Sequence, residues 1–234
     1  KDSVAAILLD CMQEEIEARP SALDVVVRVR ALLNPEPEVT TIQATAEIDV
    51  VPVGKVESEL VARRFGNNYE LKEKLGVGGT GTSWLARYES EDEVRLVVIK
   101  EARDGVSFDI LNKEYSNSLQ INPPHPRFSR GFDVKRDPKP GAIINTYVYG
   151  MTLNDYLDNG NVPLADAEYV FLSALELLDH LHNQELVHGD ISPNNILVDE
   201  ATRLAYLIDF GNLHSFGEID SIFGTRITYA PEIV

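Results

Sequence analysis

The stretch Val187-His188-Gly189-Asp190-Ile191-Ser192-Pro193-Asn194-Asn195-Ile196-Leu197 carries the strongest signal in this sequence. It follows a helical pattern over 165–183 and ends in an apolar run typical of a buried strand, so its polar residues are expected to form a loop. Asp190 and Asn195 stand five residues apart in that loop. A carboxylate held there can accept a hydroxyl proton, and an amide oxygen can ligate a hard cation.

A second acidic motif, Asp209-Phe210-Gly211, follows the apolar run Tyr206-Leu207-Ile208. At the end of a predicted strand, its carboxylate would supply the second oxygen ligand for Mg²⁺, which keeps part of its water shell. Either motif alone is also typical of an ordinary turn, since Asp and Asn are common in turns. Because the two motifs occur together and in this order, ordinary turns are a poor explanation for them.

The glycine-rich run Gly76-Val77-Gly78-Gly79-Thr80-Gly81 lies between two predicted strands. Without Cβ atoms, such a hairpin can fold over phosphate oxygens and offer them backbone amide hydrogens. It can also be a simple flexible turn. Because a strand is predicted after Gly81, the dinucleotide-binding fingerprint, which needs a helix there, is disfavoured.

Lys100 ends the next predicted strand, in the run Val97-Val98-Ile99-Lys100. An ammonium group buried among aliphatic side chains needs an anionic partner. Glu114, on a helix predicted over 108–120, is the candidate for that partner. The alternatives are a lysine that faces water at a strand end and an ordinary solvated carboxylate on a helix.

The order of predicted elements indicates an α+β protein with a β-rich lobe followed by an α-rich lobe. Strand-forming runs are expected at 69–75, 83–88, 94–100 and 142–148, before a helix-rich part that begins after Gly150. Two helices are expected to bury apolar stripes. The stripes are Phe108, Leu111, Tyr115 and Leu119 in the first helix and Ala167, Phe171, Ala174, Leu178 and Leu181 in the second.

Composition excludes several classes of function. Of the 234 residues, 21 are Lys or Arg and 38 are Asp or Glu, and the resulting net charge of −17 opposes binding to nucleic acid or to an anionic membrane. The apolar stretches fall short of the ~20 residues that a membrane span needs. The single Cys11 cannot form an internal disulfide. A cytoplasmic protein without membrane insertion in this segment is expected.

Taken in order, the glycine-rich run, Val-Val-Ile-Lys, the helix glutamate, His-Gly-Asp with Asn195, Asp-Phe-Gly and Ala230-Pro231-Glu232 resemble the signatures of a protein kinase, of the eukaryotic-like Ser/Thr type found widely in bacteria. The resemblance runs from about Tyr69 to Glu232. It implies a bilobal protein-kinase-like fold with a truncated C-lobe, ATP and Mg²⁺ as cofactors, and a protein substrate that offers a Ser or Thr hydroxyl.

The resemblance also implies a role for each site residue. Lys100 would hold the α and β phosphates, and Glu114 would orient Lys100. Asp190 would accept the hydroxyl proton, while Asn195, which completes the catalytic set, and Asp209 would ligate Mg²⁺. The other positions implied to bind the cofactor are Gly76, Val77, Gly78, Gly79, Gly81, Val98, Thr146 and Val148, with Asn145 at the back of the adenine pocket.

Four features depart from the family pattern. Gly189 replaces an Arg that reads a phosphate on the activation segment, so control by that phosphorylation is not expected. Ser192 replaces a Lys that contacts the γ-phosphate, which predicts slower turnover. Ser83 replaces an apolar residue beside adenine, and the interval from Lys100 to Glu114 is short for the family.

The predicted division has four parts. Residues 1–34 are a helical segment resembling the C-terminal end of a kinase domain, with a helix that starts at Ser21; 35–66 are a linker, 67–148 the N-lobe, and 149–234 a partial C-lobe that ends at Ala-Pro-Glu. Two explanations stay open. Residues 1–34 could end a preceding kinase domain in a longer polypeptide with other domains, or Arg19 could pair with Glu232 within this chain.

Three functions are compatible with these residues. The first is transfer of the γ-phosphoryl group of ATP to a protein Ser or Thr. The second is a small-molecule phosphotransferase of the antibiotic-kinase type, which also uses His-Gly-Asp, although Asp-Phe-Gly and Ala-Pro-Glu argue against it. The third is a non-catalytic kinase-like regulatory domain, which Ser192 would favour.

Overall fold

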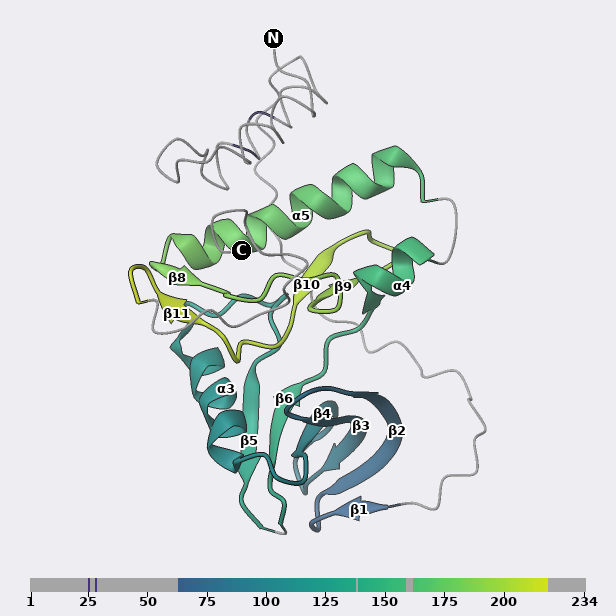
Figure 1. Ribbon diagram of the computed structural model, residues 1–234. Helices are drawn as coiled ribbons and strands as arrows, with labels where there is room; N and C mark the ends of the chain where they lie inside the picture. The colour runs from purple at the N-terminus through teal and green to yellow at the C-terminus, as the bar shows by residue number, and fades with distance from the viewer. Residues whose placement is uncertain (1–24, 26–27, 29–62, 138, 159–161, 219–234) are drawn as a thin grey trace.

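The computed structural model of the protein describes Val25, Arg28 and residues 63–137, 139–158 and 162–218. Figure 1 shows a curled sheet beside helix α3 in one lobe and the long helix α5 crossing the other. A β-rich N-lobe precedes a C-lobe with helices and short strands, so the predicted α+β class and bilobal arrangement are confirmed. No helix within the described ranges has the length and apolar character needed to cross a membrane.

Six antiparallel strands form the N-lobe sheet, in the order β1-β2-β3-β4-β6-β5. They are β1 (Arg64–Phe65), β2 (Tyr69–Val77), β3 (Gly81–Glu89), β4 (Val94–Ala102), β5 (Gly131–Lys135) and β6 (Ala142–Thr146). The four predicted runs correspond to β2, β3, β4 and β6. β1 pairs with β2 and lies in the range predicted to be a linker, so the sheet begins before residue 67.

Strand β4 shows how the sheet separates its core from its functional face. Val97 and Ile99 are fully buried in the apolar core inside the curl. Because successive side chains of a strand point to opposite faces, Val98 and Lys100 lie on the other face. Leu111 of α3 packs against this second face. The alternation therefore turns Lys100 toward α3 rather than toward the core of the curl.

Helix α3 (Phe108–Gln120) has the predicted bounds and most of the predicted apolar stripe, since Leu111 is buried and Phe108 and Tyr115 pack against the same small core. Ser107 caps it, because its hydroxyl accepts a hydrogen bond from the backbone N–H of Asp109 at 3.2 Å. Leu119, expected on the inner stripe, is 38% exposed. The buried positions of the helix are Leu111, Glu114, Asn117 and Ser118. The inward face of α3 therefore combines the predicted apolar stripe, without Leu119, with polar residues that the stripe did not include.

Within residues 139–158 and 162–218, the C-lobe contains two helices and two small sheets. The helices are α4 (Leu153–Asp158) and α5 (Leu164–His182), and the strands are β7 (Met151–Thr152), β8 (Leu186–Val187), β9 (Ile196–Val198), β10 (Ala205–Leu207) and β11 (His214–Ser215). β10, β9 and β7 form one sheet, and β11 pairs with β8. Their shared core includes residues from α5 and Phe210 of the Asp-Phe-Gly motif.

The apolar stripe of α5 was predicted correctly only in part. Ala174 and Leu181 are buried as expected, whereas Phe171 is 41% exposed. The buried face also contains Val170 and Leu177, which belong to the C-lobe core. Near Phe171, the helical residue Val25 is buried against Leu172 and Leu175 of α5. Apart from Val25 and Arg28, the predicted segment 1–34 lies outside the described residues.

His125 is expected to make the fold sensitive to acid. The centre of its ring lies 5.2 Å from the centre of the Phe128 ring. Burial, aided by the nearby Arg127 and His180, lowers the pKa of His125 from 6.5 to about 4. The native state therefore binds fewer protons than the unfolded state between these values, and the free energy of unfolding falls as the pH drops through this window. Over this window, protonation of His125 lowers the free energy of unfolding by about 1–3 kcal/mol.

Urea unfolding measured between pH 7 and pH 4.5 tests this expectation. His125→Asn should retain the hydrogen bond that the ring Nδ1 accepts from the backbone N–H of Arg127 while removing the titrating group. The variant should therefore lose less stability across this pH range than the parent protein does, even if it is less stable at pH 7. An unchanged pH dependence would show that His125 is not responsible.

Candidate active site

A buried ion pair joins β4 to α3. The ammonium of Lys100 lies 2.6 Å from Oε2 of Glu114, and both residues are buried. β4 turns Lys100 to the face that α3 covers, and α3 carries Glu114 inward one turn after Leu111. The partner expected from the sequence is therefore the observed partner, despite the short interval between the two residues.

Asp209 completes this cluster from the C-lobe. Its Oδ2 lies 3.1 Å from the Lys100 ammonium, and its Oδ1 accepts a hydrogen bond from the backbone N–H of Gly211 at 3.2 Å. The backbone of Asp209 is left-handed, with φ of 63°. Asp tolerates this conformation better than most residues, but it still costs about 1 kcal/mol and needs support from its surroundings.

The three charges of this cluster influence one another. Burial raises the pKa of Glu114 to about 7, and the negative charge of Asp209 acts in the same direction. Burial would lower the pKa of Lys100, but the two carboxylates outweigh it and raise that pKa. Burial opposes ionisation of Asp209, but Lys100 outweighs it and lowers the pKa of that carboxyl. The lysine therefore stays protonated, between two acidic groups that compete for it.

Asp190 and Asn195 are held together in the loop between β8 and β9. The side-chain amide Nδ2 of Asn195 donates to Oδ2 of Asp190 at 3.0 Å and to its backbone carbonyl at 2.9 Å. The backbone N–H of Asn195 donates to the carbonyl of Ser192. These bonds close the loop into a compact turn, and they leave the other end of the Asn195 amide, its oxygen, for a cation.

His188 ties this loop to the strand end that carries Asp209. Its Nε2 lies 3.1 Å from the carbonyl of Ile208, and its Nδ1 accepts from the backbone N–H of Asp190. Burial lowers the pKa of His188, so the ring is neutral and its single proton lies on Nε2, the atom that faces a carbonyl. Ile208 also donates its backbone N–H to the carbonyl of Asn195. The structure thus brings the loop and the Asp209 strand together.

The role of His188 was missed in the sequence, although the residue stands in the His-Gly-Asp motif. The centre of its ring lies 5.1 Å from that of Phe210, with the two rings tilted by 54°, and Phe210 is itself 1% exposed. The rings of His188 and Phe210 therefore support the backbone near the candidate site residues Asp190 and Asp209. The signal that could have found His188 is its place directly after the apolar Val187, because a polar ring buried there must have partners on both nitrogens.

The glycine-rich hairpin joins β2 to β3. The structural reason for glycine differs from one position of the hairpin to the next. The backbone N–H of Gly78 donates to the carbonyl of Gly81 at 2.8 Å, which makes the turn tight. A Cβ on Gly81 would lie 2.4 Å from the carbonyl oxygen of Glu101, so only glycine fits there. Gly76 and Gly79 have open space around them, and Val77 is exposed. The surroundings of Gly76 and Gly79 therefore give no steric reason for glycine at these two positions.

Of the remaining predicted cofactor positions, Val98 lies on β4, Thr146 is the last residue of β6, and Val148 follows β6. Val98 is half-buried on β4, beside Asn145 of β6 in the sheet register. Thr146 ends β6, and Val148 lies buried two residues later. Within the described residues, the Oδ1 atom of Asn145 is buried without a hydrogen-bond partner. The sheet register therefore places the predicted residue Val98 next to Asn145.

Glycine at position 189 meets a requirement of the backbone. Gly189 has φ of 78°, and a Cβ there would lie 2.4 Å from the carbonyl oxygen of Asn212. Gly189→Ala is therefore expected to destabilise the protein by at least about 2 kcal/mol, whereas Gly217→Ala, with φ of 81° and open space, should cost about 1 kcal/mol. Equal losses in urea unfolding of the two variants would contradict this explanation.

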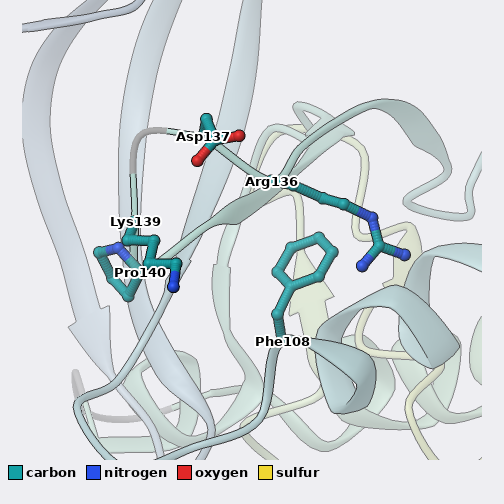
Figure 2. Close-up of a pocket in the computed structure, with 5 residues that line it drawn as sticks. All are labelled: Phe108, Arg136, Asp137, Lys139 and Pro140. Carbon is teal, nitrogen blue, oxygen red and sulfur yellow. The ribbon is translucent and has the colours of Figure 1, made fainter.

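A cavity of about 390 Å³ lies apart from these residues, at the start of α3 (Figure 2). The residues that line it are Phe108, Arg136, Asp137, Lys139 and Pro140. The Arg136 guanidinium lies 5.0 Å from the centre of the Phe108 ring, a cation–π contact that helps to shape this surface. None of the predicted site residues lines this cavity, so it is not the candidate active site.

The donor set fits Mg²⁺ better than a metal held by protein alone. The described residues contain no group of three or more His, Cys, Asp or Glu side chains that could hold a metal ion. The side chain of Asp209 is 40% exposed. The backbone carbonyl of Asn195 accepts a hydrogen bond from the backbone N–H of Ile208, the residue before Asp209. Two oxygen ligands plus water and phosphate oxygens are the usual environment of Mg²⁺.

Glu232, like Arg19, lies outside the described residues.

Comparison with known proteins agrees with this geometry. The family described as protein kinase domain matches residues 69–234. The chain belongs to the protein kinase family. The predicted resemblance is thereby confirmed, and the family generally uses ATP with Mg²⁺ and acts on protein substrates.

Three curated relatives of this kinase chain are bacterial. The serine/threonine-protein kinase PrkC of Bacillus subtilis is 24% identical over 179 residues, which cover 75% of this chain and 26% of PrkC. Serine/threonine-protein kinases D and C of Synechocystis are 27% and 26% identical and cover 71% and 63% of this chain. The chain spans 36% of kinase D and 29% of kinase C, about a third of each.

Proposed function

We propose that this kinase chain transfers the γ-phosphoryl group of ATP to a Ser or Thr hydroxyl of a protein. The observation that carries the proposal is Lys100, which contacts Glu114 from the N-lobe and Asp209 from the C-lobe at 2.6 and 3.1 Å. This contact joins the two lobes at the point where a nucleotide phosphate would need a cation. The names of the relatives, each a serine/threonine-protein kinase, support the class of acceptor.

The residues divide the work of the reaction between them. Lys100 would bind the phosphates of ATP, and the backbone of residues 76–81 would cover them. Asp209 and Asn195 would hold Mg²⁺, which when bound neutralises charge on the phosphate oxygens. Asp190 would accept the proton of the attacking hydroxyl on its carboxylate, which Asn195 orients. Because such catalysis depends on positioning and charge, the hydrogen bonds that join the two loops contribute directly.

A transfer assay in the intact protein tests the proposal. The protein is incubated with Mg²⁺ and ATP labelled in the γ-phosphate, and label is measured on dephosphorylated casein, on the protein itself and on an aminoglycoside. Label on Ser or Thr that is absent from the Asp190→Asn variant supports the proposal. Label on the aminoglycoside alone would instead identify a small-molecule phosphotransferase. Nucleotide binding without any transfer would identify a non-catalytic domain.

A further inference from the structure

The inner face of α3 combines apolar packing with polar contacts. Of its four buried residues, only Leu111 is apolar, and the others are Glu114, Asn117 and Ser118. A buried polar side chain destabilises a protein unless its hydrogen-bonding atoms find partners. Here each has one, and the partners come from different parts of the molecule. The position of α3 therefore depends on specific hydrogen bonds as well as on the packing of Phe108, Leu111 and Tyr115.

Asn117 makes contacts that neither the sequence motifs nor the proposed mechanism assigns. It is 4% exposed, and its Nδ2 lies 2.9 Å from the carbonyl oxygen of Phe210 and 3.3 Å from those of Gly211 and Leu213. Its Oδ1 accepts from the side chain of Gln120. The amide thus gathers three backbone carbonyls of the segment that directly follows Asp209.

These contacts close a ring of interactions around Asp209. Glu114 lies one turn before Asn117 on the same helix, and it contacts Lys100, which also contacts Asp209. From Asp209 the backbone continues to Phe210, whose carbonyl returns to Asn117. Asp209 has a left-handed backbone, which needs support from neighbouring atoms. The ring supplies that support from the side chain of Asp209 and from the backbone after it.

We propose that Asn117 is a positioning residue that couples the docked position of α3 to the backbone conformation of Asp209-Phe210-Gly211. When α3 is docked, Glu114 reaches Lys100 and Asn117 holds the backbone that presents Asp209 to the metal and phosphates. When α3 moves away, both contacts are lost together. The consequence for catalysis rests on the proposed function, but the coupling itself does not.

Ser118 provides a matched control within the same helix. Its hydroxyl accepts from the backbone N–H of Gly131 at 2.8 Å and donates to the carbonyl of Tyr115 at 2.7 Å. These bonds tie α3 to β5 and not to the segment after Asp209. Ser118→Ala therefore removes buried hydrogen bonds next to Asn117 while leaving the proposed coupling in place. It separates a loss of general stability from a loss of coupling.

Asn117→Asp is the most informative variant, because it keeps the shape of the side chain and replaces two donor hydrogens by an acceptor. An oxygen would then face three carbonyl oxygens. Hydrogen exchange in the intact protein should become about tenfold faster at the amides of residues 209–213 in Asn117→Asp and Asn117→Ala, but not in Ser118→Ala. Unchanged exchange there, or the same change in Ser118→Ala, would overturn the coupling.

Nucleotide binding tests the consequence for the site. ATP affinity is measured with Mg²⁺ and with EDTA, and the ratio should fall about tenfold in Asn117→Asp and stay near the parent value in Ser118→Ala. In the transfer assay, kcat should fall while KM for the protein acceptor changes little. An unchanged ratio and kcat in Asn117→Asp would overturn the positioning role. A parent protein without transfer activity would defeat the proposed function, while hydrogen exchange would still decide the coupling.

Discussion

Asp190→Asn is expected to lower the rate of phosphoryl transfer about 10²- to 10⁴-fold, the usual contribution of a positioned general base. The variant should remain folded, because asparagine has nearly the same shape and its amide oxygen can still accept the bond from Nδ2 of Asn195. What it loses is the ability to take up the hydroxyl proton. The measurement is kcat with a protein acceptor, alongside ATP affinity, which should stay close to that of the parent.

Asp158→Asn is the control for this variant. Asp158 lies exposed at the end of α4, where its carboxylate accepts a hydrogen bond from Asn154, and it receives the same chemical change away from the site. Its kcat should equal that of the parent. If Asp190→Asn transferred phosphate as fast as Asp158→Asn, then Asp190 would not be the base.

The candidate site was predictable because its chemistry is carried by short loops with fixed spacing. Asp190 and Asn195 lie close enough in sequence for one turn to bring them together, and their hydrogen bonds show that it does. Asp209 follows a strand, so its place at the strand end could be inferred as well. The contact of Lys100 with Glu114 needed one further step, because a lysine in an aliphatic strand has few ways to be buried.

Periodicity predicted the inner face of α3 only in part, because Phe108, Leu111 and Tyr115 pack inward as expected. Apolar residues suggested a stripe that includes Leu119, but the buried positions include Asn117 and Ser118. Their partners are the carbonyl of Phe210 and the backbone N–H of Gly131, which are distant in sequence and carry no side-chain signal. A pattern search that counts only apolar residues places such polar positions on the solvent side, and tertiary contacts then overrule it.

Strand β1 was missed for a different reason. It has only two residues, Arg64 and Phe65, which is too short to show any alternation. Its place depends on Phe65, which is 4% exposed in the core of the curl, and on the neighbouring Arg63, which pairs with Glu101 of β4 at 2.8 Å. Both interactions join distant parts of the chain, so the local sequence resembles a linker although the segment completes the sheet.

Lys100→Met is expected to have the largest effect on stability, and it should lower activity as well. It leaves the carboxylates of Glu114 and Asp209 near each other without the cation that contacts both, and breaking a buried ion pair in this way costs about 3–5 kcal/mol. Because the pKa of Glu114 is raised to about 7 even beside Lys100, the variant should relieve the repulsion by protonating Glu114. Its instability should therefore become smaller as the pH is lowered from 8 to 6.

The double variant Lys100→Met/Glu114→Gln separates stability from catalysis. Glutamine removes the unpaired charge from the interior, so the free energy of unfolding should return most of the way to the parent value and lose the pH dependence of the single variant. Phosphoryl transfer should stay at least about 10²-fold below the parent in both variants, because neither has an ammonium group to bind the phosphates. Urea unfolding and kcat, measured on the same preparations, test the two statements independently. A double variant that stays as unstable as Lys100→Met would show that Lys100 stabilises the fold by packing rather than by charge, whereas parent-like transfer in either variant would remove Lys100 from the mechanism.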